Sequence, residues 1–230
     1  MVFVGTMACA QFDLGLSTGA YVFTIRSRGS TSAIQNKYTP TGDPLPTLSL
    51  SYNERTSVKG ADLTLALDYV YKEFHAFLYS GGHFGSSTEL DLQLHLLYFT
   101  VAPDIHLDPG GNSALRIGLQ FGTLLSGHER GMRRDQGVDP NGVYYSTIEQ
   151  INGRTNLVGG DLRALFGLRV MPLISGKRWL MVDMYASFAL SGLVRGEASS
   201  RGMDMGLRAG YLLHSKGRAI TVVLNDLGPE

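Results

Sequence analysis

Large apolar side chains alternate with small or polar ones through most of this chain. In residues 115–122 the odd positions are leucine, isoleucine and phenylalanine, whereas the even positions are arginine, glycine and glutamine. Because successive side chains of a β-strand point to opposite faces, this pattern predicts a two-faced strand. The polar face carries glycine, arginine and aspartate instead of the lysine and glutamate of a water-exposed sheet. The pattern therefore predicts a barrel with lipid outside and a polar interior.

The composition fits a membrane barrel and excludes other classes. The 230 residues suit one domain, and no run of about 18 apolar residues predicts a transmembrane helix. A spanning strand needs only about ten residues, and half of them can be polar. The 29 glycines lie inside the alternating segments, where they save space on the inner face. Because the formal net charge is zero, we expect no nucleic-acid partner.

The chain begins with an apolar stretch that ends in Ala8-Cys9-Ala10. This resembles the end of a secretory signal, so we predict a residual signal peptide over 1–10, cut after Ala10. Two alternatives stay open: Cys9 as a lipoprotein acceptor, and residues 1–10 as an ordinary buried strand. Cys9 is the only cysteine, so no intrachain disulfide is possible. The barrel is expected over 11–214, with 215–230 as a C-terminal tail or an extension of the last strand.

Eight spanning segments are predicted, and their connections alternate between long and short. The segments are 12–26, 46–54, 61–78, 89–101, 113–127, 159–173, 178–194 and 202–214. The longest connection is 128–158. Because outer-membrane barrels have long external loops and short periplasmic turns, we expect both chain ends in the periplasm. The fold class is therefore all-β: an eight-stranded antiparallel transmembrane β-barrel whose polar interior is filled by side chains.

The alternation also assigns each residue to a face. On the fourth segment we expect Leu90, Leu92, Leu94 and Leu96 to point outward, with Asp91, Gln93 and His95 inward. Across all segments the predicted interior polar network is Asp68, Lys72, Asp91, His95, Arg116, Asp161, Arg163, Arg169, Asp183, Asp204 and Arg208. It balances five acids against five bases, as buried charges require. An aromatic girdle at the lipid headgroups is predicted from Tyr69, Tyr71, Tyr98, Phe99, Trp179 and Tyr211.

Several motifs suggest catalysis, but each has a simpler explanation. Gly15-Leu16-Ser17-Thr18-Gly19 matches a nucleophile elbow, yet it lies inside a predicted strand with no following helix. The pairs His83/Ser86 and His214/Ser215 and the loop histidine His128 are expected to be exposed polar residues. The acids Asp135, Asp139 and Glu149 match no calcium loop. We therefore assign no catalytic, cofactor-binding or metal-binding residue and expect no cofactor.

Several segments resemble the PorT-like outer-membrane β-barrel family of Bacteroidetes-type bacteria. Residues 90–98 are similar to the tyrosine- and leucine-rich fourth strand of that family, and residues 117–126 to its glycine-rich strand that ends in Leu-Leu-Ser. Residues 161–167, 185–193 and 207–211 are similar to the closing strands. The likeness covers about residues 11–213. It implies a barrel in the outer membrane of a Gram-negative cell envelope; some members belong to a protein-secretion apparatus, and no catalytic residues transfer.

The expected function is that of an outer-membrane barrel without enzymatic activity. It acts through its extracellular loops or as a component of an envelope or secretion complex. Its expected partners are outer-membrane lipid and, through loop 128–158 or the C-terminal tail, envelope or secretion-complex proteins. Three alternatives are a lipid-modifying barrel enzyme, a small porin or transporter, and a soluble ligand-binding barrel with the apolar face inside.

Overall fold

The computed structural model describes residues 3–7, 12–26, 34–56, 58, 60–81, 84–155, 158–174, 177–178, 180–193, 201–214 and 220–224. The strands are β1 (Phe3–Met7), β2 (Phe12–Arg26), β3 (Ile34–Pro40), β4 (Leu45–Arg55), β5 (Ala61–Gly81), β6 (Gly85–His106), β7 (Ser113–Val138), β8 (Tyr144–Arg154), β9 (Asp161–Val170), β10 (Leu173–Ile174), β11 (Lys177–Arg178), β12 (Leu180–Ala189), β13 (Arg201–His214) and β14 (Ile220–Leu224). In these residues no helix is long and apolar enough to cross a membrane.

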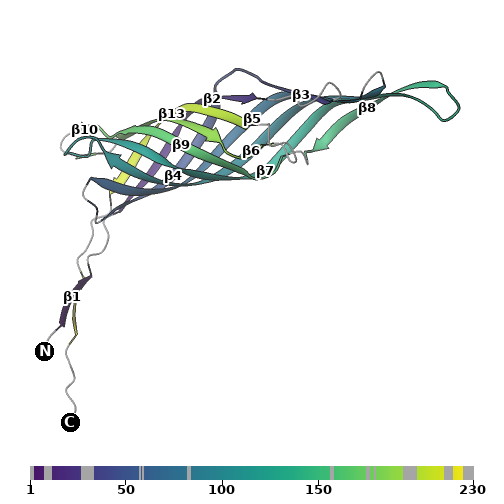
Figure 1. Cartoon of the computed structure of the whole chain (residues 1–230). Helices are drawn as coiled ribbons and strands as arrows, with labels where there is room; N and C mark the ends of the chain where they lie inside the picture. Colours follow the sequence, from purple (N-terminus) through teal and green to yellow (C-terminus); the bar gives the residue numbers. More distant parts are fainter. Residues whose placement is uncertain are drawn as a thin grey trace, which may run out of the picture.

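Eight of the strands form a closed ring. Taken in order, β2, β4, β5, β6, β7, β9, β12 and β13 each pair antiparallel with the next, and β13 pairs with β2. The order of the strands around the ring is therefore their order along the chain. The predicted fold class, an eight-stranded antiparallel barrel, is confirmed (Figure 1).

Three strands continue past the ring and gain two further partners. β3 pairs with the far part of β5, and β8 pairs with the far part of β7. We call this five-stranded sheet the extension: β3, β8 and residues 73–81, 85–93 and 128–138 of β5, β6 and β7. In Figure 1 the hairpin of β7 and β8 reaches well away from the barrel. The predicted loops 27–45 and 128–158 thus contain paired strands, because pairing satisfies backbone groups that a loop would leave to water.

The opposite end of the ring carries short turns. The turn between β6 and β7 is shorter than the predicted 102–112, because β6 continues to His106. Asp108 organises it: its carboxylate accepts hydrogen bonds from the backbone N–H of Ser113 at 2.6 Å and the Ser113 hydroxyl at 2.7 Å. These bonds, with one from the Asn112 N–H, lower the pKa of Asp108 to about 2. Gly111 has a φ of 63°, the left-handed region that favours glycine.

Two small sheets lie apart from the ring. β10 and β11 pair within the turn before β12, and β1 pairs antiparallel with β14. Residues 220–224 of the expected tail therefore pair with the N-terminal strand. The predicted cleavage point after Ala10 falls outside the described residues, and so does the expected girdle residue Trp179.

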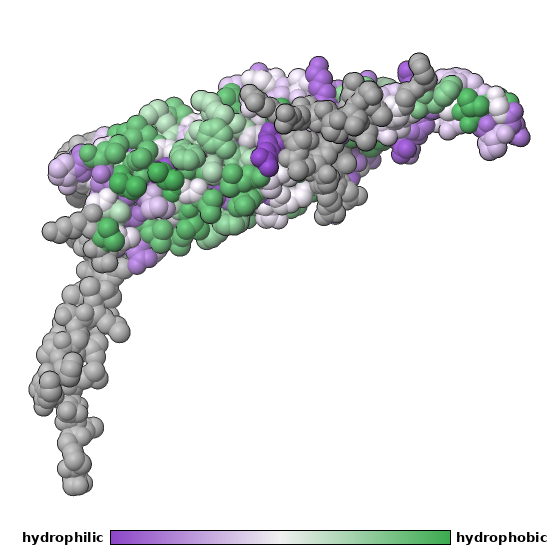
Figure 2. Space-filling model, in the orientation of Figure 1, coloured by the Kyte–Doolittle hydropathy of each residue, from purple (hydrophilic) through white to green (hydrophobic). Residues whose placement is uncertain are grey.

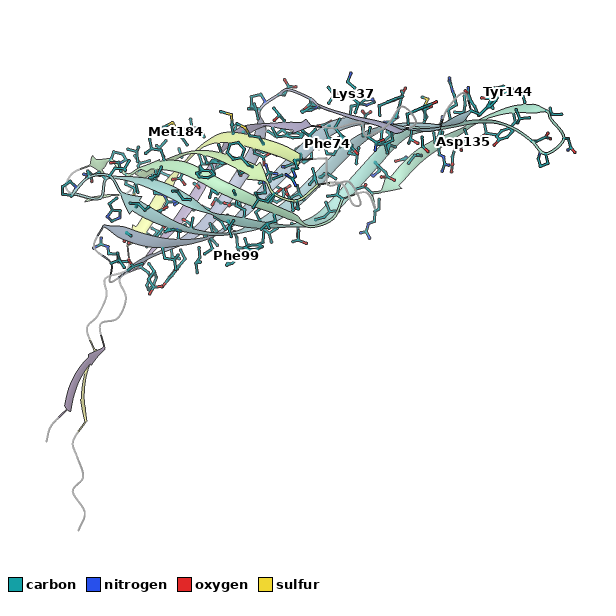
Figure 3. The ribbon with its side chains drawn as sticks, viewed as in Figure 1. Lys37, Phe74, Phe99, Asp135, Tyr144 and Met184 are labelled. Atoms are coloured by element: carbon teal, nitrogen blue, oxygen red, sulfur yellow. The ribbon has the colours of Figure 1, made fainter. Side chains whose placement is uncertain are left out.

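The outer surface of the ring is apolar on every strand. Exposed apolar side chains there include Leu14, Leu16, Leu48, Leu50, Leu67, Phe99, Leu115, Ile117, Leu119, Phe166, Met184, Met205 and Leu207. Figure 2 shows this hydrophobic band over the barrel, and Figure 3 shows Phe99 and Met184 projecting from its wall. The soluble alternative required these side chains to line a cavity, so it is overturned. A closed antiparallel barrel with this exterior has the architecture of an outer-membrane β-barrel.

Candidate functional site

The barrel interior contains a closed cycle of two acids and two bases near the short turns. Arg116 pairs with Asp104 at 2.7 Å and with Asp183 at 3.3 Å, and Arg169 pairs with the same carboxylates at 3.2 and 2.8 Å. Thr64 donates to Asp104 at 2.8 Å. All four charged side chains are buried. A buried charge is tolerated only when it is paired and hydrogen-bonded, and the cycle meets that condition.

Two further layers of charge follow along β5. The Asp68 carboxylate is ion-paired with Arg208. It also accepts hydrogen bonds from the Thr100 hydroxyl at 2.6 Å and from the Gln120 side-chain amide at 3.2 Å. The Arg208 guanidinium also lies 4.4 Å from the centre of the Tyr185 ring. Four residues further along β5 on the same face, Lys72 pairs with Asp204 at 2.9 Å. The partners in these layers come from strands far apart in sequence, so they tie the ring together across its interior.

The last charged layer ends against an apolar layer. Arg163 bridges Asp161 at 2.9 Å and Asp204 at 3.0 Å, and the Tyr98 hydroxyl donates to Asp161 at 2.7 Å. Toward the extension the interior is then filled by apolar side chains, including Tyr21, Phe23, Phe74, Leu90, Leu92, Leu94 and Leu96. The interior is therefore polar at the end with short turns and apolar toward the extension.

Most of the predicted interior network lies where the alternation placed it. Nine residues are buried inside the ring: Asp68, Lys72, Arg116, Asp161, Arg163, Arg169, Asp183, Asp204 and Arg208. The prediction is wrong for Asp91 and His95, which lie on the outer face. It is equally wrong for Leu90, Leu92, Leu94 and Leu96, which are buried, and for the girdle residue Tyr98.

These errors share one cause, which is a change of phase in β6. The apolar residues occupy even positions up to Leu96 and odd positions from Leu97 to Val101. Toward the extension the outer face of β6 meets water, so its apolar side chains point inward. Within the membrane the outer face meets lipid, so its apolar side chains point outward. The fifth interior acid is Asp104, which the prediction missed. Thr100, Ala102 and Asp104 all occupy even positions of β6, and this run of small or polar residues was the signal for it.

A row of aromatic and polar side chains marks where this change occurs on the outer face. Tyr71 on β5, His95 on β6 and Ser126 on β7 lie side by side. The Tyr69 hydroxyl and the Nδ1 atom of His95 are 2.5 Å apart, and the rings of Tyr71 and His95 have centres 5.2 Å apart. Tyrosines at this position fit the predicted girdle at the lipid headgroups.

Beyond this row the outer face of β5 and β6 carries polar side chains that pair with one another. His75 and Asp91 pair at 3.0 Å, and Gln93 donates to Glu73 at 3.4 Å. Figure 3 shows Lys37, Asp135 and Tyr144 on the same part of the molecule. The membrane boundary therefore lies near the row of Tyr71, His95 and Ser126, and the extension lies outside the membrane.

The motifs examined for catalysis lie in varied places. Ser17 of the Gly-x-Ser-x-Gly match is buried within β2. In the described part of the chain, His75 and His106 have carboxylate partners and His95 has a phenol. The His83 residue and the His214 side chain are outside the described set. Asp139 accepts backbone hydrogen bonds from Asn141 and Val143 in the turn before β8.

Asp135 lies on the extension. It pairs with Arg133 at 3.0 Å, and its pKa is lowered by a hydrogen bond from Ser86 and by Arg133.

Comparison with known proteins finds likeness only among solved structures. No protein-family model matches the chain, and no curated protein matches it. The attachment invasion locus protein Ail of Yersinia pestis is 14% identical with a TM-score of 0.42, covering 87% of this chain and 98% of that one. Neisserial surface protein A is 10% identical with a TM-score of 0.39, covering 87% and 96%. The outer membrane protein OprG from Pseudomonas aeruginosa is 10% identical with a TM-score of 0.34, covering 90% and 98%.

Proposed function

We propose that the barrel anchors the extension in a bacterial outer membrane, and that the free edge of the extension binds an extended segment of a partner protein. The partner is an extracellular protein or another component of the cell envelope. A role without enzymatic activity and membership of the PorT-like family remain predictions from the sequence.

The observation that carries this proposal is the edge strand β8. Among the described residues it pairs with β7 alone, which leaves its other side free, and almost all of its side chains are exposed. An unpaired edge presents a row of backbone N–H and C=O groups to which another strand can add. Natural edge strands are commonly protected by lysine, proline or a bulge. β8 is 11 residues long and contains neither lysine nor proline, and its register with β7 is continuous.

The tip beside this edge is apolar for a water-exposed surface. Val143, Tyr144, Tyr145 and Ile148 are all exposed, and the Tyr144 ring lies 6.1 Å from that of Phe84. Because exposed aromatic and branched side chains anchor partners well, the tip supplies side-chain contacts and the edge supplies backbone hydrogen bonds.

The test compares proline with alanine along β8. The backbone N–H groups of neighbouring strand residues point to opposite sides of the strand. Of the two variants Ile148→Pro and Glu149→Pro, one therefore removes an N–H from the free edge, and the other removes a hydrogen bond to β7. Peptides selected from a displayed library on the protein in lipid nanodiscs serve as the probe. The proposal expects the proline at the edge donor to abolish their binding while its alanine counterpart keeps it. Binding that survives both proline variants would overturn the proposal.

Neither a porin nor a lipid-modifying enzyme has a specific observation in its favour within the described residues. The charged layers and the apolar layer fill the barrel along β5 from Thr64 to Phe74. Conductance in planar bilayers remains the direct measurement for a porin.

A further inference from the structure

A group of three arginines and one histidine lies on the outer face of the extension just above the membrane boundary. His128, Arg130 and Arg134 are on β7, and Arg154 on β8 lies directly opposite His128. All four side chains are exposed. Directly opposite residues of an antiparallel pair have Cβ atoms about 5 Å apart, and the next residue on the same face is about 7 Å along the strand. His128, Arg130 and Arg154 therefore form one compact group, which we call the cation cluster.

No ion pair engages the arginines of the cation cluster among the described residues. On the outer face β8 has no acidic residue, and neither has β7 beyond Ser126. On β6, Asp91 lies opposite Arg130 and is hydrogen-bonded to His75 at 3.0 Å, and Glu89 lies opposite Met132. In the part of the chain that the structure describes, no carboxylate lies within ion-pair distance of Arg130 or Arg154. By contrast Arg133, on the opposite face of β7, pairs with Asp135 at 3.0 Å.

A β-bulge determines the direction of these side chains. Leu96 pairs with Leu124 and His95 pairs with Ser126, so Leu125 has no partner in β6. Before the bulge the outward residues of β7 are odd, as at Leu119; after it they are even. If β7 continued past Leu124 in regular one-to-one register, His128 would lie opposite Leu92 and Arg130 opposite Leu90, and both would point into the apolar layer. Bulges commonly re-aim side chains in this way.

The cation cluster is level with the lipid headgroups. The row of His128 and Arg154 is the next one above the row of Tyr71, His95 and Ser126. One row corresponds to about 7 Å along a strand and to less along the membrane normal, because barrel strands are tilted. Below it on β7, Leu125 and, four residues further into the membrane, Phe121 present exposed apolar surface where acyl chains lie.

From these observations we infer that the cation cluster of Arg130, Arg154 and His128 binds phosphate groups of anionic lipid headgroups in the surrounding leaflet. Arginine suits this ligand because its planar guanidinium donates two parallel hydrogen bonds to a phosphate. The apolar surface at Phe121 and Leu125 holds the acyl chains of the same lipid. The inference is independent of partner binding at the free edge of β8.

The test uses the full chain refolded into phosphatidylcholine vesicles that contain a trace of spin-labelled lipid. Electron paramagnetic resonance separates lipid held against the barrel from free lipid and gives a relative association constant for each headgroup. Wild type is expected to prefer phosphatidic acid over phosphatidylcholine. Each arginine that is removed should lower this preference about fivefold, and the double variant R130Q/R154Q removes both.

The matched control is R133Q, which removes an arginine from the same strand but the other face. It should keep the wild-type preference, and a heat-dependent gel shift shows that each variant is folded. An unchanged preference in R130Q/R154Q, or an equal loss in R133Q, would overturn the inference. Millimolar inorganic phosphate should leave the preference intact, since the free ion lacks acyl chains. If inorganic phosphate abolished the lipid preference, the cluster would be a site for free phosphate, and the proposal that it binds lipid headgroups would be overturned.

Discussion

The strands β5, β6 and β7 pass through two solvents, and the two parts differ in which face is apolar. Within the membrane Leu67, Phe99 and Leu119 point outward to lipid, and Asp68, Thr100 and Gln120 point inward. In the extension His75, Asp91 and Arg130 point outward, and Ala76 and Leu90 point inward. The pairing of β5 with β6 is continuous across the change, and the pairing of β6 with β7 crosses it with one bulge between His95 and Leu96. Backbone pairing therefore sets the architecture, whereas the surrounding solvent sets which face carries the apolar residues.

The largest effect is expected where a buried charge loses its partner. Arg163→Met leaves Asp161 and Asp204 without the guanidinium that bridges them. Breaking a buried pair should lower the free energy of unfolding by roughly 3–5 kcal/mol. Urea unfolding in lipid vesicles measures it. Arg133→Met breaks the exposed pair with Asp135 on the extension and should change stability by less than about 1 kcal/mol. Equal losses of unfolding free energy in the two variants would show that water hydrates the charged groups of the barrel interior.

A more direct test places arginine on the outer face of β7 in each solvent. Leu119 and Met132 have similar exposed fractions, 43% and 46%. Leu119→Arg should destabilise the barrel by roughly 2–4 kcal/mol if it lies near the bilayer midplane, and Met132→Arg by almost nothing. The measurement is again unfolding in vesicles. If both arginines are tolerated, the apolar band does not face lipid.

Gly118 in the ring and Gly153 on β8 lie in different surroundings. A Cβ atom at Gly118 would lie 2.4 Å from the Cβ of Ala102 and 2.4 Å from the carbonyl oxygen of Val101. Gly118→Ala should therefore lower stability by roughly 1–3 kcal/mol through overpacking. At Gly153 on β8 a Cβ meets nothing within 4 Å, so Gly153→Ala should be nearly neutral. The temperature of the gel-migration shift compares the two variants.

The smallest effect on stability is expected in the turn between β6 and β7, where the carboxylate of Asp108 is accessible to water. The pKa of Asp108 is lowered to about 2 by its hydrogen bonds in the folded state. Its contribution to stability is therefore present above the unfolded pKa near 4 and is lost as the pH falls toward 2. The stability difference between wild type and Asp108→Asn should shrink over that window. A difference that stays constant from pH 6 to about pH 2 would show that the carboxylate charge is irrelevant to the turn.

The ring was predictable from sequence because its alternation is long and uninterrupted. In residues 161–170 and 203–211 every second position is apolar and points outward, as predicted, and the inward Leu165 is the exception to the polar inner face. Strand β6 was not predictable by the same rule, since the prediction assumed one solvent along the whole strand. Its phase change at Leu96 and Leu97 contains the missing information and marks the membrane boundary.

The extension needed information that alternation does not contain. β8 is exposed on both faces, so its sequence shows no apolar stripe, and its pairing with β7 depends on the partner strand. The bulge at Leu125 is a single extra residue, which is visible only once β6 is placed beside β7. The cation cluster depends on that bulge and could not be found without it.

The ion pairs inside the barrel have a consequence for assembly. Asp204 and Arg208 both lie on β13, the strand that closes the ring against β2, and their partners Lys72 and Asp68 lie on β5, 132 and 140 positions earlier in the chain. Until the last strand arrives, those earlier charges have no counter-charge from it. A half-built barrel would expose them to hydrocarbon, so partial insertion is strongly disfavoured. Closure and neutralisation are thus a single cooperative event, which favours entry into the bilayer with all strands in place and makes the route slow, because its decisive contacts are the most distant in sequence.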